Sequence, residues 1–179
     1  NSGVYMQVRG TLNATGAKFT ANGSTTKGFW DGIYVSYEYY ETGSVTLDNC
    51  TVEYARNIYT RKGQLTLKNS TVNNFSEYGV QVSAQGILNL DNATIKNTNF
   101  PIYFYGQGVL NSINNSVLTG NANDYIYLNF SDITSVFRLP NLNIPYYNPY
   151  KRVTETGTWI IDPGVQLKMV NSEIVVNGK

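Results

Sequence analysis

The stretch Gly43-Ser-Val-Thr-Leu-Asp-Asn-Cys-Thr-Val52 sets a pattern that the chain repeats. A Gly is followed by apolar residues two and, in most copies, four positions later, then by Asn at the sixth position and an apolar residue three positions beyond it. The pattern returns in Gly63-Gln-Leu-Thr-Leu-Lys-Asn-Ser-Thr-Val72, Gly86-Ile-Leu-Asn-Leu-Asp-Asn-Ala-Thr-Ile95 and Gly108-Val-Leu-Asn-Ser-Ile-Asn-Asn-Ser-Val117. The four Gly residues are spaced by 20, 23 and 22 residues, and Gly10 begins an earlier copy. A fixed period of this length is typical of repeat architectures.

Alternation of apolar and polar residues within each copy predicts a β-strand with one buried face. The Asn that follows tolerates the left-handed backbone conformation of a sharp bend, and stacked amides can hydrogen-bond from one copy to the next. We therefore expect a corner at this Asn and an inward residue beyond it. The expected corners are Asn49, Asn69, Asn92 and Asn114, with Gly16 in the earliest copy.

A second alternating segment precedes each Gly. These segments are residues 33–35, 58–60, 80–82, 102–104 and 126–128, and most read Ile-Tyr-x. Each period of about 22 residues thus holds three short strands joined by bends, and one period alone cannot bury its apolar face. The sequence predicts an all-β, right-handed parallel β-helix in which stacked turns build the core.

The repeat, together with the Phe29-Trp30-Asp-Gly-Ile33 segment, resembles the right-handed parallel β-helix repeats of bacterial surface and secreted proteins. The resemblance covers about residues 1–135, and these repeats are related in fold to pectate lyases. It implies an extracellular or cell-surface location in a bacterium. It does not imply one activity, because this fold carries lyases, glycosidases, tailspikes and adhesins.

The domain organisation expected from these patterns is a single domain in three parts. Residues 1–135 form the β-helix turns, residues 136–156 form a Pro- and Tyr-rich loop, and residues 157–179 form end strands. The segment from Asn171 to Gly178 is similar to the segment from Asn1 to Gly10, so residues 157–179 are a candidate start of a further repeat unit, with neighbouring units stacked end to end. Chance similarity in a sequence dominated by few residue types is the alternative.

Composition excludes several classes of function. The 179 residues include no His and one Cys, so His-based catalysis and Cys or His metal clusters are absent, and we expect no cofactor or metal. A net charge of +1 offers no basic field for nucleic acid. No apolar run is long enough to span a membrane. Cys50 occupies an inward repeat position and is expected to be a small buried side chain.

Carboxylates do not form a convincing catalytic pair. Asp48, Lys68 and Asp91 occupy the same outward position in successive copies, which places the two acids about 9.6 Å apart with a lysine between them. We interpret this column as a salt-linked ladder, and the Arg56, Arg61 and Lys62 group has no matching acids in the next copy. The chain is therefore predicted not to be an enzyme, with a polysaccharide lyase or glycoside hydrolase, or its substrate-binding part, as the alternative.

The 15 Tyr residues motivate a second candidate, the binding of polysaccharide or cell-surface glycan. Aromatic faces shed water readily and pack against sugar rings while the hydroxyl stays solvated. Stacking of the rings on one another would hide those faces. The candidate ligand-binding residues form two groups. One is an outward column with Tyr105 beside it, and the other lies in loops. The column consists of Tyr34, Tyr59, Tyr103 and Tyr127, and the loop residues are Tyr37, Tyr39, Tyr40, Tyr146 and Tyr147.

A third candidate is ice binding through the outward column Thr51, Thr71, Thr94 and Ser116. One column is narrow for lattice matching, and Thr is common at exposed strand positions. The function that the sequence favours is a non-catalytic extracellular scaffold or adhesin module of a larger protein, with glycan binding through exposed Tyr.

Overall fold

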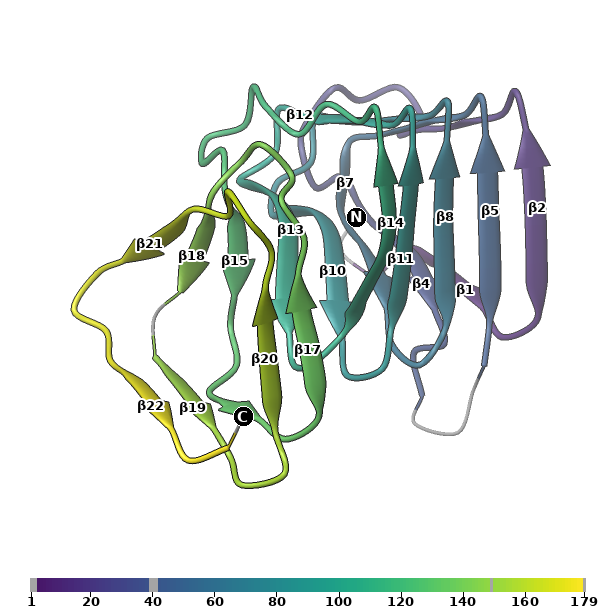
Figure 1. The fold of residues 1–179 in the computed structure, drawn as a ribbon. Coiled ribbons are helices and arrows are strands. Elements are labelled where there is room, and N and C mark those ends of the chain that lie inside the picture. Colours follow the sequence, from purple (N-terminus) through teal and green to yellow (C-terminus); the bar gives the residue numbers. More distant parts are fainter. Residues whose placement is uncertain (1–2, 39–41, 149, 179) are drawn as a thin grey trace.

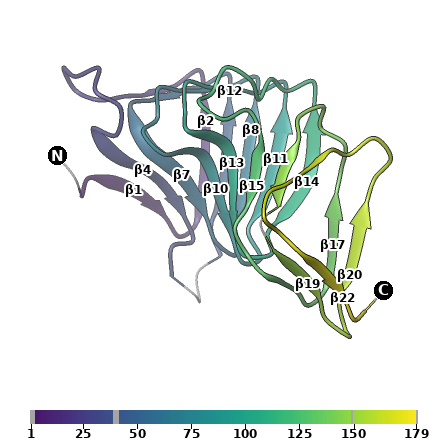
Figure 2. The same ribbon diagram turned by 90° about the vertical axis from the view of Figure 1, so that its left-hand side faces the viewer.

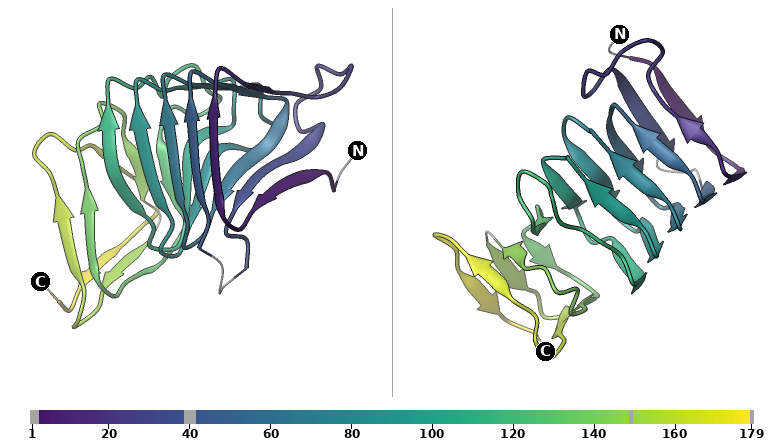
Figure 3. Two further views of the ribbon diagram at one scale, coloured as in Figure 1. Left: turned by 90° about the vertical axis from the view of Figure 1, so that its right-hand side faces the viewer. Right: turned by 90° about the horizontal axis from the view of Figure 1, so that it is seen from above.

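A computed structural model describes residues 3–38, 42–148 and 150–178. These residues form parallel β-strands and no helix, wound into a β-solenoid of about seven turns with a spacing of roughly 23 residues. The predicted parallel solenoid is confirmed. We call each turn a rung. Figure 1 shows the strands of successive rungs side by side, and Figure 3 shows the N- and C-terminal ends at opposite ends of the stack.

The longest sheet, sheet A, takes one strand from every rung. Its outer surface runs along the whole solenoid (Figure 2). Its strands, in spatial order, are β1 (Tyr5–Val8), β4 (Trp30–Val35), β7 (Ala55–Thr60), β10 (Tyr78–Ser83), β13 (Phe100–Tyr105), β15 (Ile126–Leu128), β18 (Tyr146–Asn148) and β21 (Leu167–Met169).

Two further sheets take one strand each from the first four rungs, and one of them also takes a strand from the fifth. Sheet B holds the strands of the Gly-initiated pattern, and sheet C holds the short strands after the corner. Sheet B consists of β2 (Thr11–Thr15), β5 (Ser44–Asp48), β8 (Gln64–Lys68), β11 (Ile87–Asp91) and β14 (Val109–Asn114), and sheet C of β3 (Lys18–Phe19), β6 (Thr51–Glu53), β9 (Thr71–Asn73) and β12 (Thr94–Lys96).

The segment 136–156, predicted as a loop, instead contains three strands and continues the solenoid. Pro140 and Pro145 lie between strands, where a missing N–H is tolerated. Strands of residues 157–178 pair with it as a further rung. The strands outside sheets A to C are β16 (Asp132–Ile133), β19 (Lys151–Val153) and β22 (Ile174–Val176) in sheet D, and β17 (Val136–Leu139) and β20 (Thr158–Ile161) in sheet E.

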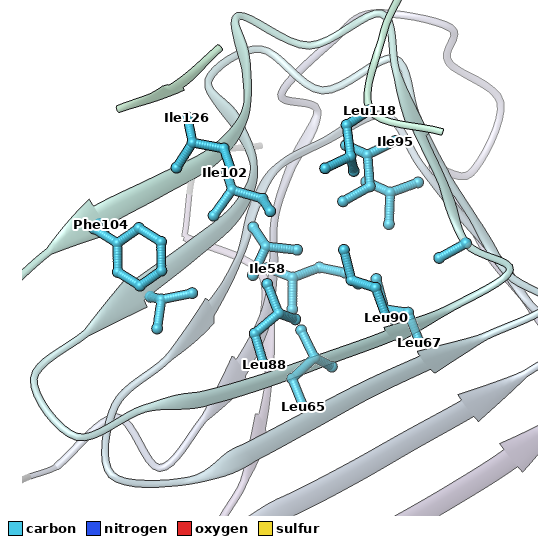
Figure 4. Packing of buried hydrophobic residues seen from close by; sticks show 14 of the residues in the cluster. Ile58, Leu65, Leu67, Leu88, Leu90, Ile95, Ile102, Phe104, Leu118 and Ile126 are labelled. Carbon is cyan, nitrogen blue, oxygen red and sulfur yellow. The ribbon is translucent and has the colours of Figure 1, made fainter. Parts of the chain in front are cut away.

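The core consists of inward side chains stacked in columns, as Figure 4 shows for the middle rungs. Val45, Leu65 and Leu88 pair in register and are completely buried. The same holds for Leu47, Leu67 and Leu90. Each such side chain contributes roughly 1.5–3 kcal/mol by leaving water. Because each column is built from side chains of successive rungs, stability comes from stacking neighbouring rungs. Cys50 is buried as predicted.

Four of the five predicted corners adopt the left-handed conformation. The φ angles of Gly16, Asn49, Asn69 and Asn92 are 65°, 53°, 48° and 53°. The corner predicted at Asn114 is displaced by one residue, because strand β14 contains a bulge opposite Leu88 and Asn89. Asn115, with φ 46°, therefore turns the chain in place of Asn114.

The same bulge corrects two other predictions. Ile113, rather than Ser112, pairs with Leu90. On sheet C, Thr94 forms its bridge with Val117. The predicted Thr column thus ends in an exposed Val, while Ser116 lies beside the core and accepts a hydrogen bond at Oγ from the Ala93 N–H.

The repeat Gly is required because two backbones approach closely. A Cβ at Gly63 would lie 2.6 Å from Ser36 Oγ and 2.7 Å from the Gly43 carbonyl oxygen. Gly86, Gly157 and Gly178 are similarly close to the carbonyl of the preceding rung, so the column continues into the C-terminal rungs. The repetition of a whole unit, suggested by the two similar ends, stays a prediction.

Candidate functional site

The outer face of sheet A carries a continuous column of side chains, one from each rung. Strand register places Gln7, Tyr34, Tyr59, Gln81, Tyr103, Tyr127, Tyr147 and Lys168 in that order. The predicted Tyr column is therefore present. It extends further than expected, because Tyr147 lies on strand β18 and joins it. The two Gln positions and the final Lys divide the face into aromatic and polar parts.

The first aromatic cluster surrounds Tyr34. Its ring stacks on Tyr5 at 4.9 Å between centroids and on Tyr37 at 5.3 Å, and Tyr59 meets the pair edge-on at 5.9 Å. Burial between these rings raises the pKa of the Tyr34 phenol. Both faces of Tyr34 are thus covered by neighbours, whereas Tyr37 remains 46% exposed.

The second aromatic cluster lies beyond Gln81. Tyr78 and Tyr103 stack at 4.0 Å, and Tyr103, Tyr127 and Tyr147 continue the stack at 5.2 Å and 4.9 Å. Phe100 and Tyr125 pack beside this column. Desolvation raises the pKa of Tyr103 to about 12, with Tyr78 as a further cause. These rings mostly cover one another, which makes the second cluster a structural layer.

A pocket of about 280 Å³ opens beside the first cluster, next to Gln81. Aromatic and polar side chains share its wall. The lining residues are Tyr34, Tyr37, Arg56, Asn57, Tyr59, Glu77, Gln81 and Tyr105. A larger pocket, of about 330 Å³ beside strand β14, has no aromatic side chain in its wall. We therefore take the pocket beside Gln81 as the candidate site and call it the Asn57 pocket.

Asn57 is the most buried polar side chain in the wall of this pocket, with 6% exposure. It lies on strand β7 two residues before Tyr59, so both side chains point to the outer face. Its Nδ2 donates to Gln81 Oε1 at 3.4 Å, and its Oδ1 has no hydrogen-bond partner. A buried unpaired carbonyl oxygen costs free energy unless a donor reaches it.

Arg56 forms one side of the pocket and pairs with two carboxylates. Its Nη2 lies 2.7 Å from Glu77 Oε1, and its Nη1 lies 3.6 Å from Asp31 Oδ1. The prediction that Arg56 lacks an acid in the next copy is therefore wrong. Glu77 lies beside Arg56 in the next rung, where its N–H also donates to the Arg56 carbonyl at 3.2 Å. The hydrogen bond and charge of Glu77 raise the pKa of the Arg56 guanidinium.

The predicted Tyr residues separate into three groups. Tyr34, Tyr37, Tyr59 and Tyr105 line the pocket, and Tyr103, Tyr127 and Tyr147 form the second cluster. Tyr146 was expected to present a free face in a loop, but it points inward on strand β18, is completely buried and donates to the Pro140 carbonyl at 2.8 Å. Tyr39 and Tyr40 lie outside the described residues.

Sequence reasoning missed Asn57, Tyr78, Phe100 and Tyr125 as parts of this face. Asn57 precedes the Ile-Tyr-Thr strand by one residue, and strand β7 begins earlier, at Ala55. Period-two alternation extended backwards from Tyr59 could have found it. The same extension backwards from Tyr127 reaches Tyr125, which precedes Ile126 by one residue.

The other predicted clusters lack the features of a ligand site. Asp48, Lys68 and Asp91 are in register as expected, and Lys68 Nζ lies 3.5 Å from Asp48 Oδ2. A hydrogen bond from Asn69 is the main cause that lowers the pKa of the exposed Asp48 carboxyl. Among residues 3–38, 42–148 and 150–178, no group of three or more Cys, Asp or Glu side chains could hold a metal ion.

No family model, no curated protein and no solved structure matches this chain. In the part of the chain that the structure describes, there is also no helix that is long and apolar enough to cross a membrane.

Proposed function

We propose that this chain is a non-catalytic, extracellular β-solenoid module of the scaffold or adhesin kind, and that it binds polysaccharide on the outer face of sheet A. The observation that carries the proposal is the Asn57 pocket, where a buried unpaired amide oxygen lies among Tyr side chains. A sugar ring supplies both things that this wall lacks: a hydroxyl donor for the oxygen and an apolar face for the rings.

Tyr37 and Tyr105 supply the contact surface. They are 46% and 58% exposed, whereas the other rings of the pocket are half-buried. Each is a rigid amphipathic side chain that loses little conformational entropy when a ligand packs on it. The stacked rungs beneath hold these rings at fixed positions, which reduces the ordering cost of binding.

A scaffold role agrees with the distribution of charge. Two outward acids near these strands pair with cations, Asp48 with Lys68 and Glu77 with Arg56. A carboxylate held in an ion pair is a poor proton donor at neutral pH, and the hydrogen bond from Asn69 lowers the pKa of the Asp48 carboxyl. Hydrolysis or elimination at the bound polysaccharide is therefore not part of the proposal.

Affinity electrophoresis in native gels tests this function. The protein is run through gels that contain hydroxyethyl cellulose, xyloglucan, galactomannan or polygalacturonate, beside bovine serum albumin as a non-binding reference. We expect at least one polysaccharide to retard the protein and the double variant Tyr37→Ala/Tyr105→Ala to migrate freely. Tyr150→Ala is the matched control, because Tyr150 is 38% exposed and lies outside sheet A.

Two results would contradict the proposal. Equal migration of the wild type in all gels would exclude binding to these polysaccharides. Release of reducing ends or unsaturated products, abolished in Asp91→Asn, would show that the module is catalytic.

A further inference from the structure

We infer that the Asn57 pocket selects uncharged sugar residues and rejects acidic ones. The inference rests on the proposed function and deepens it by naming the class of glycan. It follows from which hydrogen-bonding groups and charges of the wall already have partners.

The hydrogen-bonding inventory of the pocket calls for a donor from the ligand. Asn57 Oδ1 is a buried acceptor without a partner, and Asn57 Nδ2 is already directed at Gln81 Oε1. A sugar hydroxyl can donate to Asn57 Oδ1, whereas an ionised carboxylate or sulfate only accepts. The most buried polar atom of the site therefore favours a hydroxyl over an anionic group.

The charges of the pocket wall also favour an uncharged ligand over an anionic one. Arg56 is the cation that lines the pocket among the described residues, and its guanidinium already contacts Glu77 and Asp31. Two carboxylates thus accompany one guanidinium. A uronic acid would bring a third negative charge beside Glu77, which already holds the guanidinium through two nitrogens, with Nε at 3.1 Å and Nη2 at 2.7 Å.

The aromatic side chains of the wall require a ligand with an apolar ring face, but they do not distinguish charged from uncharged sugars. Tyr37 and Tyr105 present ring faces and edges that accept the C–H face of a pyranose. Uncharged hexoses and pentoses meet this requirement as well as uronic acids do. Asn57 favours a hydroxyl at its own position, and discrimination between neutral and acidic sugars falls to the group formed by Arg56, Glu77 and Asp31.

A matched pair of polysaccharides separates the two classes. Hydroxyethyl cellulose and carboxymethyl cellulose share one backbone and differ in charge, and xyloglucan and galactomannan are further neutral probes beside the acidic polygalacturonate and alginate. Dissociation constants come from the retardation at several polysaccharide concentrations, at low and at high salt. We expect binding of at least one neutral probe and at least ten-fold weaker binding of every acidic probe.

Glu77→Gln tests the cause of this selectivity. The variant releases Arg56 from its shorter ion pair, so we expect several-fold tighter binding of acidic probes, and salt should weaken that gain. Asp132→Asn is the matched control, because it removes the same charge from a similar surface pair with Arg152, on sheet D. Thermal unfolding of both variants verifies that they fold.

Three outcomes overturn the inference in distinguishable ways. Acidic probes that bind as tightly as neutral ones would exclude the selectivity and leave the proposed function intact. Equal gains in acidic binding for Glu77→Gln and Asp132→Asn would show that net charge, not the pocket, sets the preference. Failure of every probe would overturn the proposed function together with the inference.

Discussion

Asn92 donates a hydrogen bond from Nδ2 to Oδ1 of Asn69, one rung earlier, at 2.9 Å. Asn69 in turn donates to Asp48 Oδ1 at 3.0 Å, so the corner amides form a ladder that ends on a carboxylate. Three further amide pairs run in the same direction, from the later rung to the earlier: Asn97 to Asn73, Asn111 to Asn89 and Asn123 to Asn99. The abundant Asn of this chain therefore joins rungs as well as turning corners.

Two substitutions at Asn69 separate these roles. Asn69→Gly removes the ladder and retains the left-handed conformation at φ 48°, and we expect a loss of about 1 kcal/mol in unfolding free energy. Asn69→Ala also removes the ladder but keeps a Cβ in that conformation without the side-chain amide that makes it tolerable for Asn, so we expect it to be roughly 1–2 kcal/mol less stable than Asn69→Gly. Denaturant unfolding of both variants measures the difference. An Ala variant at least as stable as the Gly variant would contradict the account of the corner.

The repeat Gly offers a second matched pair. Gly63→Ala pushes a Cβ against the Ser36 hydroxyl and the Gly43 carbonyl, and we expect a destabilisation of about 2 kcal/mol. Gly10→Ala is the control, because Gly10 holds the same position in the first rung and has no atom within 4 Å of the added Cβ. Thermal or denaturant unfolding should show little change for Gly10→Ala. Similar losses in both variants would mean that close approach does not explain the Gly.

The sequence was sufficient to predict the solenoid and the outward Tyr column, because both follow from the regular spacing of Gly, Leu and Asn. It was insufficient where an inserted residue changes the register. The bulge in strand β14 displaces the corner from Asn114 to Asn115, and spacing alone does not show where the chain absorbs the extra residue. Tyr146 shows a second limit: its Pro-rich surroundings indicated a loop, but Tyr146–Asn148 form strand β18 and pair with the neighbouring rungs.

The Asn57 pocket could also not be predicted from the sequence. Its residues come from strands of different rungs and from the turn that contains Tyr37, so only the stacking brings them together. The ion pair between Arg56 and Glu77 depends on their sequence separation of 21, which is close to one period of the solenoid. A comparison of residues that lie one period apart in the sequence could have paired these two residues.

Lys151 is a buried cation at an inward position of strand β19. Its Nζ donates to the carbonyls of Leu128, at 3.1 Å, and Tyr150, at 2.9 Å, and lies 4.8 Å from the centre of the Phe130 ring. Desolvation lowers its pKa from 10.5 to about 8. A depression of this size corresponds to a penalty of about 3 kcal/mol for the charged amine in the folded protein.

This burial predicts a pH-dependent gain in stability for Lys151→Met. Below pH 8 the lysine is charged in both states and the folded protein carries the whole penalty. Between pH 8 and 10.5 the unfolded state binds more protons, so the penalty fades as the pH rises. We expect the variant to be more stable than the wild type at pH 7 by up to about 3 kcal/mol, with the gap closing towards pH 10.

Thermal unfolding of the two proteins at pH 7, 8, 9 and 10 measures this gap. Titration of Tyr residues affects both proteins equally and cancels in the comparison. A gap that stays constant over this range would show that Lys151 carries no depressed pKa. A less stable variant at pH 7 would show that the two hydrogen bonds and the Phe130 contact outweigh the cost of burial.

The most direct test of glycan binding at the Asn57 pocket is a nuclear magnetic resonance titration of the side-chain amides. The protein, labelled with nitrogen-15, is titrated with an oligosaccharide cut from whichever polysaccharide retards it, and the NH₂ signals of Asn57 and Gln81 are followed. We predict that these two signals show the largest shifts, while those of Asn141 and Asn143, in a pocket without aromatic side chains, stay in place. Unchanged Asn57 and Gln81 signals in the presence of bound oligosaccharide would contradict the account.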